Sequence, residues 1–430
     1  MKIILIYLLI FTFYIDQVLG PVGFSIKGLS LFNLNIYLLL IVWAIPVIQR
    51  RRKFMQPNNV NKYIIIMGFL MLLSIFVKIL RNEIPDISIK YEIIELKSWL
   101  NPVLLFFILF NIINDEKTCN RTLVGLGLLF FALILTQLSA TFGITGLKAH
   151  SMEVHGRAGG FGAAGEYAIT LALFFPFVLS VSVLSKRIPP FKIGAIILTF
   201  LILMGLVNAG SRNGVVSFFC SMLVYLVLLK RKKIMGLLPI IFLISMMIVV
   251  GVTAFLVSPS SVKVVVTERF DPTNAEDART YTSGRTELWK NGWNLFIDSP
   301  IWGHGRNTFK ELSRLKGYPT YGHPHNEYLR HLAENGLFGF IIYILIYLKI
   351  FQNIWRALDK TSDFWRKSLY LSYIAGLCGF MTGAFATNTA PSLYIFWIYT
   401  ALIYKYVQLE NYDNQSSTKN REALVISSTM

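Results

Sequence analysis

Apolar runs of about twenty residues recur along most of this chain, with short polar stretches between them. Each run is long enough to cross a bilayer as one helix. The pattern predicts an all-α, polytopic integral membrane protein with about twelve transmembrane helices, in a single transmembrane domain over residues 1–407. The polar residues 408–430 are predicted to be a disordered tail. The predicted spans lie near residues 3–20, 30–49, 62–80, 98–113, 122–143, 161–183, 192–209, 213–229, 235–257, 335–353, 368–386 and 391–407.

One polar segment is much longer than the others and is predicted to form a large loop over residues 258–334. Within it, residues 285–297 (RTELWKNGWNLFI) have the spacing of an amphipathic helix that lies along a membrane surface. Another helix is predicted to begin near Asn326 and to enter the tenth span through Glu334 and Gly336. The apolar stripe of the amphipathic helix is predicted to comprise Leu288, Trp289, Gly292, Trp293, Leu295 and Phe296.

The composition supports a membrane protein, since 54% of the residues are hydrophobic and 15% are charged, against about 25% charged in soluble domains. The net charge of +18 would indicate nucleic-acid binding in a soluble protein. Here the basic residues gather after each even-numbered span, which is the orientation signal of membrane insertion. We therefore expect cytoplasmic termini and no nucleic-acid partner. The first twenty residues resemble a signal peptide, but Asp16 and the missing small-x-small cleavage site favour a retained helix.

The same orientation rule places the loops 144–160, 210–213, 258–334 and 387–390 on the outer face. Charges in these loops therefore need another explanation than membrane insertion. Histidines confined to one face of a membrane protein suggest a functional site there. The outward cations and histidines are Arg157, Arg212, Arg279, Arg285, Arg306, Arg314, Arg330, His150, His155, His304, His323, His325 and His331.

Three of these arginines have surroundings that favour an anionic ligand. Arg157 lies in the glycine-rich stretch HGRAGGFGAAGEY, and Arg212 lies in the tight turn NAGSRNG between two spans. Arg285 stands in the first turn of the predicted amphipathic helix. A guanidinium group pairs bidentately with phosphate oxygens. The structural alternatives are a snorkelling side chain for Arg157, an exposed turn for Arg212 and a plain interfacial helix after Arg285.

The segment HPHNEYLRH, residues 323–331, brings imidazole and carboxylate groups together. Its His-x-His-x-Glu spacing suits a metal, but no cluster of carboxylates or thiols completes a coordination shell, and the three cysteines are scattered. A general base is more economical, because an imidazole accepts a proton near neutral pH. Asn326 and Glu327 are placed to orient it or a sugar hydroxyl. The chain lacks an Asp-x-Asp motif, so arginines rather than a metal would have to neutralise a leaving diphosphate.

These motifs resemble the O-antigen ligase / Wzy polymerase superfamily over about residues 150–345. The family pattern contains an Arg followed by a Trp, a Pro-x-x-Gly-x-Gly turn, a His-Asn-x-x-Leu segment and a Glu-x-Gly-x-x-Gly helix entry. GRAGGF around Arg157 also matches, but the usual Pro-Asn after it is replaced by residues 163–166, which makes Glu166 an additional base candidate. The matching positions are Pro300, Gly303, Gly305, His325, Asn326, Leu329, Glu334, Gly336 and Gly339.

The resemblance implies a metal-independent, inverting glycosyltransferase of the GT-C type, without a cofactor, in a bacterial inner membrane with its active site facing the periplasm. The implied donor is an oligosaccharide on undecaprenyl diphosphate, and the implied acceptor is a glycan or lipid A-core in lipopolysaccharide assembly. Arg157, Arg212 and Arg285 would hold the donor diphosphate, and His325 would deprotonate the acceptor hydroxyl. A polysaccharide chain-length regulator is a candidate partner beside the bilayer itself. The supporting residues would be His323, Asn326, Glu327 and Glu166.

Alternative functions remain open at this point. A polymerase and a ligase of this superfamily differ in acceptor, and family analogy favours a polymerase because nothing in the sequence marks a groove for lipid A. A lipid-linked sugar transporter also fits about twelve spans, but transporters place ionisable groups near the membrane midplane and show internal repeats. A receptor or structural protein would leave the arginines and the histidine segment unexplained.

Overall fold

The structure is a computed structural model that describes residues 2–19, 30–51, 56, 58–81, 89–144, 164–184, 189–270, 284–318, 323–387, 389 and 393–429. Within these ranges the regular elements are helices. In chain order they are α1 (Lys2–Leu19), α2 (Leu31–Ile48), α3 (Asn61–Arg81), α4 (Ile89–Ile112), α5 (Glu116–Thr141), α6 (Ala164–Leu184), α7 (Pro189–Ala209), α8 (Arg212–Arg231), α9 (Leu237–Val257), α10 (Ser260–Phe270), α12 (Arg285–Asp298), α13 (Phe309–Leu315), α14 (Glu327–Lys360), α15 (Phe364–Gly383) and α16 (Leu393–Thr429).

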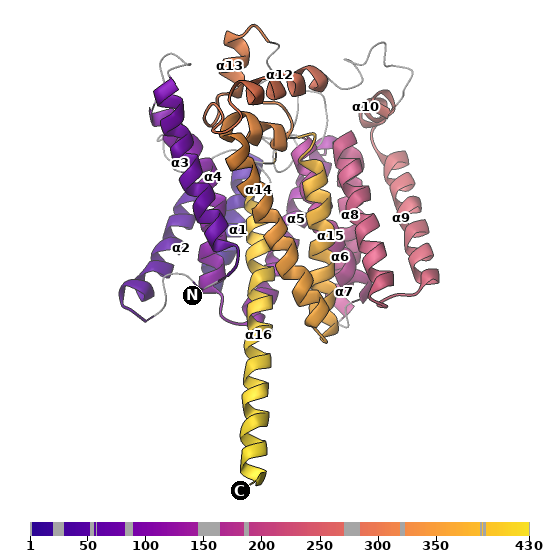
Figure 1. Ribbon diagram of the computed structural model, residues 1–430. Coiled ribbons are helices and arrows are strands. Elements are labelled where there is room, and N and C mark those ends of the chain that lie inside the picture. The colour runs from indigo at the N-terminus through magenta and orange to yellow at the C-terminus, as the bar shows by residue number, and fades with distance from the viewer. Residues whose placement is uncertain are drawn as a thin grey trace.

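Ten helices of the described ranges, α1 to α9 and α14, are long and apolar enough to cross a membrane, by length and composition. They coincide with the first ten predicted spans, and α15 and α16 occupy the positions of the last two. The long helices run side by side in Figure 1, and α10, α12 and α13 gather beyond one end of the bundle. The predicted all-α polytopic class is therefore confirmed.

The helix α6 forms the centre of the bundle and packs against α7, α8 and α15. Its side chains are buried almost throughout its length. The helix α15 approaches it closely at Gly376, where a Cβ atom would stand 2.1 Å from the carbonyl oxygen of Leu173. Small residues allow membrane helices to approach in this way. The close contact between α6 and α15 holds in place two helix ends that form part of the candidate site.

The predicted amphipathic helix is confirmed as α12, which lies across the end of the bundle in Figure 1. It packs against α13 and the beginning of α14. Leu288 and Leu295 of the predicted stripe are buried, and they form a small core with Phe309 and Ala333. This core joins the helices of the outer segment to one another.

Only part of the predicted apolar stripe of α12 is buried within the protein. Trp293 is 49% exposed, whereas the polar Asn291 is buried. The contact face is shifted because Gly292 lies against α14, where an added Cβ atom would be 3.5 Å from Cβ of Leu329. Large side chains beside this glycine therefore point away from the contact.

A turn after α12 packs into a break in α14. Gly336 has φ +64° and ψ −169°, which interrupts the helix and leaves backbone groups without helical partners. Three hydrogen bonds between the turn and α14 satisfy these backbone groups. The N–H groups of His304 and Gly305 donate to the carbonyl oxygens of Ala333 (3.0 Å) and Glu334 (2.9 Å), and the N–H of Leu337 donates to the carbonyl oxygen of Pro300 (2.8 Å). The predicted helix entry is confirmed, with a short outer part of α14 before Gly336 and the span after it.

The last helix continues beyond the end of the final predicted span at residue 407. The sequence predicts a disordered tail from residue 408, whereas the structure describes α16 as one helix to Thr429. Residues 393–429 contain neither glycine nor proline, so no residue of the segment interrupts the helix. Figure 1 shows this part of α16 projecting from the end of the bundle opposite to α12 and α13.

Candidate functional site

The carboxyl end of α15 joins the amino ends of two other helices. The side-chain amide of Asn213, in the first turn of α8, donates to the carbonyl oxygen of Gly383 at 2.7 Å. The backbone N–H of Glu327, at the start of α14, donates to the carbonyl oxygen of Ala384 at 2.9 Å. These bonds bring Arg212 at the start of α8 and His325 before α14 to the same side of the bundle.

The amino end of α6 lies at the same place. A Cβ atom on Gly165 would be 2.9 Å from Oγ1 of Thr387 and 3.9 Å from Oγ of Ser211, the residue that caps α8. Glu166 follows in the first turn of α6 and is buried. Three helices thus direct their amino ends at one region, where the partial positive charge of each helix favours an anion.

The imidazole of His325 lies close to Arg285, which begins α12. Burial, the positive charge of Arg285 and the nearby His323 together lower the pKa of His325 from 6.5 to about 4. The rings of His323 and His325 are 6.0 Å apart and nearly perpendicular. His325 is therefore neutral at physiological pH and has a lone pair available to accept a proton. Two of the predicted site residues, Arg285 and His325, thus lie close together.

The backbone around His325 is fixed by the start of α14. His325 has φ +48°, a left-handed conformation that is uncommon for residues other than glycine. Asn326 follows as the N-cap of α14, and its side-chain oxygen accepts the backbone N–H of Leu329 at 3.0 Å. The side-chain oxygen of Asn326 is thus engaged in capping the helix, which sets the position of His325.

Glu327 ties the start of α14 to the loop after α15. Its carboxylate accepts the backbone N–H of Thr389 at 2.9 Å and the guanidinium of Arg330 at 3.4 Å. Arg330 also bonds Glu334 at 3.3 Å, and both carboxylates are buried. This network pairs two buried carboxylates with one guanidinium group and holds in place the start of α14, which follows His325.

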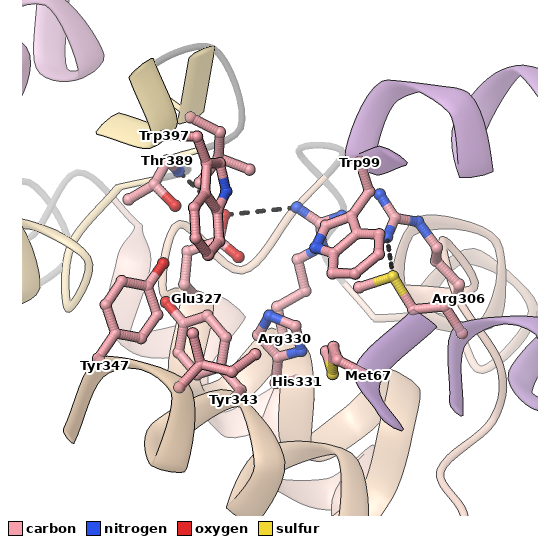
Figure 2. Close-up of a pocket in the computed structure, with 13 residues that line it drawn as sticks. Met67, Trp99, Arg306, Glu327, Arg330, His331, Tyr343, Tyr347, Thr389 and Trp397 are labelled. Atoms are coloured by element: carbon pink, nitrogen blue, oxygen red, sulfur yellow. Dashed lines mark hydrogen bonds and ion pairs between the residues drawn. The ribbon is translucent and has the colours of Figure 1, made fainter. Parts of the chain in front are cut away.

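A small cavity of about 40 Å³ lies beside this network, between α3, α4, α14 and α16. Figure 2 shows Glu327 between Thr389 and Arg330. On another side of the cavity, Nη1 of Arg306 donates to the sulfur of Met71 at 3.0 Å. The cavity is lined by residues that the sequence motifs do not mark as site residues: Arg306, Arg330 and several aromatic side chains. The aromatic residues of the lining are Trp99, Tyr343, Tyr347 and Trp397.

The ion pairs of Arg330 have a signal in the sequence, because the i, i+3 and i+7 spacing of Glu327, Arg330 and Glu334 places these side chains on one face of a helix.

Two of the histidines in the segment between α12 and the break in α14 are held in contacts with neighbouring helices or side chains. His304 bridges Nη1 of Arg81 (3.0 Å) and the carbonyl oxygen of Leu295 (2.9 Å), which connects α3 to α12. His331 is buried, stacks on the ring of Tyr343 at 4.0 Å and contacts the side-chain amide of Asn335 at 3.1 Å. The histidines of these segments therefore do not all serve one site.

Some predicted site residues lie outside the described residues. They are Arg157, Arg279, His150 and His155. Among the residues that the structure does describe, no group of three or more His, Cys, Asp or Glu side chains is arranged to hold a metal ion. Of the residues predicted to bind the donor or to act as the base, the structure describes Arg212, Arg285 and His325.

The fold and this site define a polytopic helical membrane protein with an arginine- and histidine-bearing site at one end of its bundle. Residues 197–344 match the family model of the O-antigen ligase domain, Wzy_C. Over this segment the chain is thus similar to the O-antigen ligase family, which is the similarity that its motifs predict. The matched segment contains Arg212, Arg285 and His325.

Two curated relatives were found. An uncharacterized protein of Haemophilus influenzae is 26% identical over 200 residues, which cover 43% of this chain and 48% of the relative. The teichuronic acid biosynthesis protein TuaE of Bacillus subtilis is 25% identical over 122 residues, covering 28% of this chain and 25% of TuaE. The chain therefore matches half or less of the length of these relatives.

Proposed function

We propose that this protein is a metal-independent, inverting glycosyltransferase that transfers a glycan from undecaprenyl diphosphate to the hydroxyl group of an acceptor sugar. The observation that carries the proposal is the meeting of Arg285 and a neutral His325 with the amino ends of α6, α8 and α14. A diphosphate is the kind of anion such a place favours, and an imidazole is the base that a sugar hydroxyl needs.

The proposed reaction is a single displacement. His325 takes the proton of the acceptor hydroxyl while its oxygen forms a bond to the anomeric carbon of the donor. The bond between that carbon and the diphosphate oxygen breaks on the opposite side, which inverts the configuration. Arg212 and Arg285, with Arg157 as the third candidate, neutralise the charge that develops on the leaving diphosphate. Glu327 acts through the fold, because its carboxylate is already bonded to Thr389 and Arg330.

We infer a Wzy-type polymerase as the particular activity, with an O-antigen ligase as the second candidate. One relative is named for teichuronic acid biosynthesis, so the proposed acceptor is a glycan hydroxyl and need not be lipid A-core. In this proposal the site faces the periplasm of a bacterial inner membrane, where lipid-linked glycans are presented, and both termini are cytoplasmic.

The test is an assay of the purified protein with a synthetic undecaprenyl-diphosphate oligosaccharide and EDTA, with and without lipid A-core. A ladder of products without lipid A-core supports a polymerase, and product only with lipid A-core supports a ligase. We expect His325→Ala to lower the rate by about 10²–10⁴-fold, the usual contribution of a general base. Arg212→Ala and Arg285→Ala are expected to weaken donor binding.

The matched control is His304→Gln, since His304 is a buried histidine of the same segment bonded to Arg81 and Leu295. It is expected to change stability more than the rate per folded molecule. An unchanged rate in His325→Ala would contradict the base role. Movement of intact lipid-linked donor across vesicles, without any transfer product, would instead support a transporter.

A further inference from the structure

An apolar groove lies between α5 and α7, far from the candidate site along the bundle. Its volume is about 390 Å³, within the range of about 300–1,000 Å³ of small-molecule sites. Phe177 and Val181, near the carboxyl end of α6, and Trp365, near the amino end of α15, line it. The candidate site stands at the other end of both helices, so the groove and the site are separate.

The groove opens sideways, toward whatever surrounds the bundle. The side chains of Leu128, Phe191 and Ile197 form its rim and are between 43% and 60% exposed. Phe174 and Leu198 lie at its floor and are buried. The helices α5 and α7 are long and apolar enough to cross a membrane, so the rim faces lipid chains and the groove is accessible to them.

A second cavity, of about 530 Å³, continues the groove at the ends of the helices. Its charged lining consists of Lys117, Arg121 and Glu116, and both basic side chains are exposed. We call this second cavity the mouth of the groove. The carboxylate of Glu116 accepts a hydrogen bond from Nη2 of Arg366 at 2.8 Å, so the positive charges of Lys117 and Arg121 leave the mouth with a net positive charge. The groove and the mouth share Asn120, Val124 and Phe191.

We propose that the groove and its mouth form a binding site for an anionic diacyl phospholipid. One acyl chain lies between α5 and α7, and the phosphate group lies at Lys117 and Arg121. An apolar groove that ends in a basic mouth matches an amphipathic anion of this kind, and basic pockets between transmembrane helices bind anionic head groups. A bound lipid would bridge α5 and α7 in the leaflet opposite to the candidate site.

The groove contains a glycine that allows a direct test. Gly194 lines it, and a Cβ atom there would meet no atom within 4 Å, so Gly194→Phe fills the groove without displacing a neighbour. Gly251 of α9 also has open space around its Cβ position and does not line the groove, so Gly251→Phe is the matched control. Gly127→Leu fills the groove from α5 and serves as a second variant if Gly194→Phe does not fold.

Binding of the lipid phosphate at the mouth is tested by variants that remove positive charge. Lys117→Gln with Arg121→Gln removes the two exposed basic side chains of the mouth. The control is Lys230→Gln with Arg231→Gln, an equal change of charge at the carboxyl end of α8, outside the groove and its mouth. Circular dichroism and thermal unfolding of each variant establish that it is folded before lipid binding is measured.

The measurement is native mass spectrometry of the full chain in detergent, titrated separately with dioleoylphosphatidylglycerol and dioleoylphosphatidylethanolamine. We expect the wild type to retain one phosphatidylglycerol at least fivefold more than phosphatidylethanolamine, and to unfold at higher temperature with it bound. Gly194→Phe should lose the retained lipid, and the charge variant should lose the preference, while both controls match the wild type.

Three results would overturn the proposal. Equal retention of the two lipids by the wild type would remove the anionic preference. Retention by Gly194→Phe and Gly127→Leu equal to that of the wild type would show that the lipid binds elsewhere. Displacement of phosphatidylglycerol by an equimolar amount of undecaprenyl phosphate would assign the groove to a polyprenyl lipid. None of these readouts depends on transferase activity, so they separate this site from the proposed reaction.

Discussion

His325 owes its protonation state to its neighbours. Burial, Arg285 and His323 lower its pKa to about 4, so the free protein holds a neutral but weak base. A bound diphosphate would place negative charge beside Arg285 and offset its effect, which would raise the pKa of His325 and make it a stronger base. In this proposal, binding of the donor raises the pKa of His325, which then accepts the proton of the acceptor hydroxyl more readily.

The effect of Arg285 on His325 can be measured without an activity assay. Arg285→Gln removes one cause of the lowered pKa, so the pKa of His325 should rise from about 4 toward 6.5. The pH dependence of carbethoxylation of the peptide that contains His325 reports this value, because only the neutral ring reacts. The midpoint should move to higher pH in the variant.

The control for this measurement is Arg314→Gln. Arg314 belongs to the same outer segment, but its side chain is 64% exposed and paired with Glu311. Arg314→Gln should not change the pH midpoint for carbethoxylation of His325. An identical midpoint in Arg285→Gln and the wild type would mean that Arg285 does not contribute to the lowered pKa of His325, and the proposed proximity of the two side chains would lose its support.

At the residue level, the sequence indicates chemistry better than it indicates neighbours. His325, Arg285 and Arg212 follow from residue type and motif, and their positions at helix starts agree with the sequence. The structural role of His304 could not be predicted, because its partners Arg81 and Leu295 lie on two different helices. Trp293 shows the same limit, since a periodic pattern does not reveal which neighbour a helix packs against.

At the level of elements, the turn after α12 and the break in α14 are one unit. A Cβ atom on Gly303 would be 2.5 Å from the carbonyl oxygen of Glu334, and one on Gly336 would be 2.2 Å from that of Ile301. Both glycines also have positive φ angles. The two glycine motifs are visible in the sequence, but their contact is not, because Gly303 and Gly336 are 33 positions apart in the chain, with α13 and the first turns of α14 between them.

We expect Gly336→Ala and Gly303→Ala to destabilise the protein more than Gly317→Ala. Gly317 has a similar φ of +71°, but a Cβ atom there would meet nothing within 4 Å. It therefore reports the cost of a positive φ without any steric collision, about 1–2 kcal/mol. The collision with backbone atoms should add about 1–3 kcal/mol in the other two variants.

Thermal unfolding of the three alanine variants in one detergent tests this expectation. Gly336→Ala should also lower the rate, because the bonds at residues 333–337 hold the outer part of α14, which presents His325. Equal melting temperatures for the three variants would mean that the turn and the break move apart without cost, and that this contact does not position the site.

At the scale of the whole molecule, the number and order of the long helices could be predicted well, because apolar length is a local property of the chain. The contact between the ends of α6, α8, α14 and α15 could not be predicted from the sequence, because it depends on close packing such as that of Gly376 on Leu173. The basic clusters predict that this meeting point faces outward, and this orientation decides which lipid-linked substrates reach the site.

The orientation can be tested with single cysteines in a background where Cys119, Cys220 and Cys378 are serine. Lys310 of α13 and Lys230 at the end of α8 are both exposed. A membrane-impermeant maleimide should label Lys310→Cys readily in intact spheroplasts. It should label Lys230→Cys only after the membrane is permeabilised. The reverse pattern would place Arg285 and His325 on the cytoplasmic side, where the outward-facing donor proposed here is not presented, and the transferase mechanism would have to be abandoned.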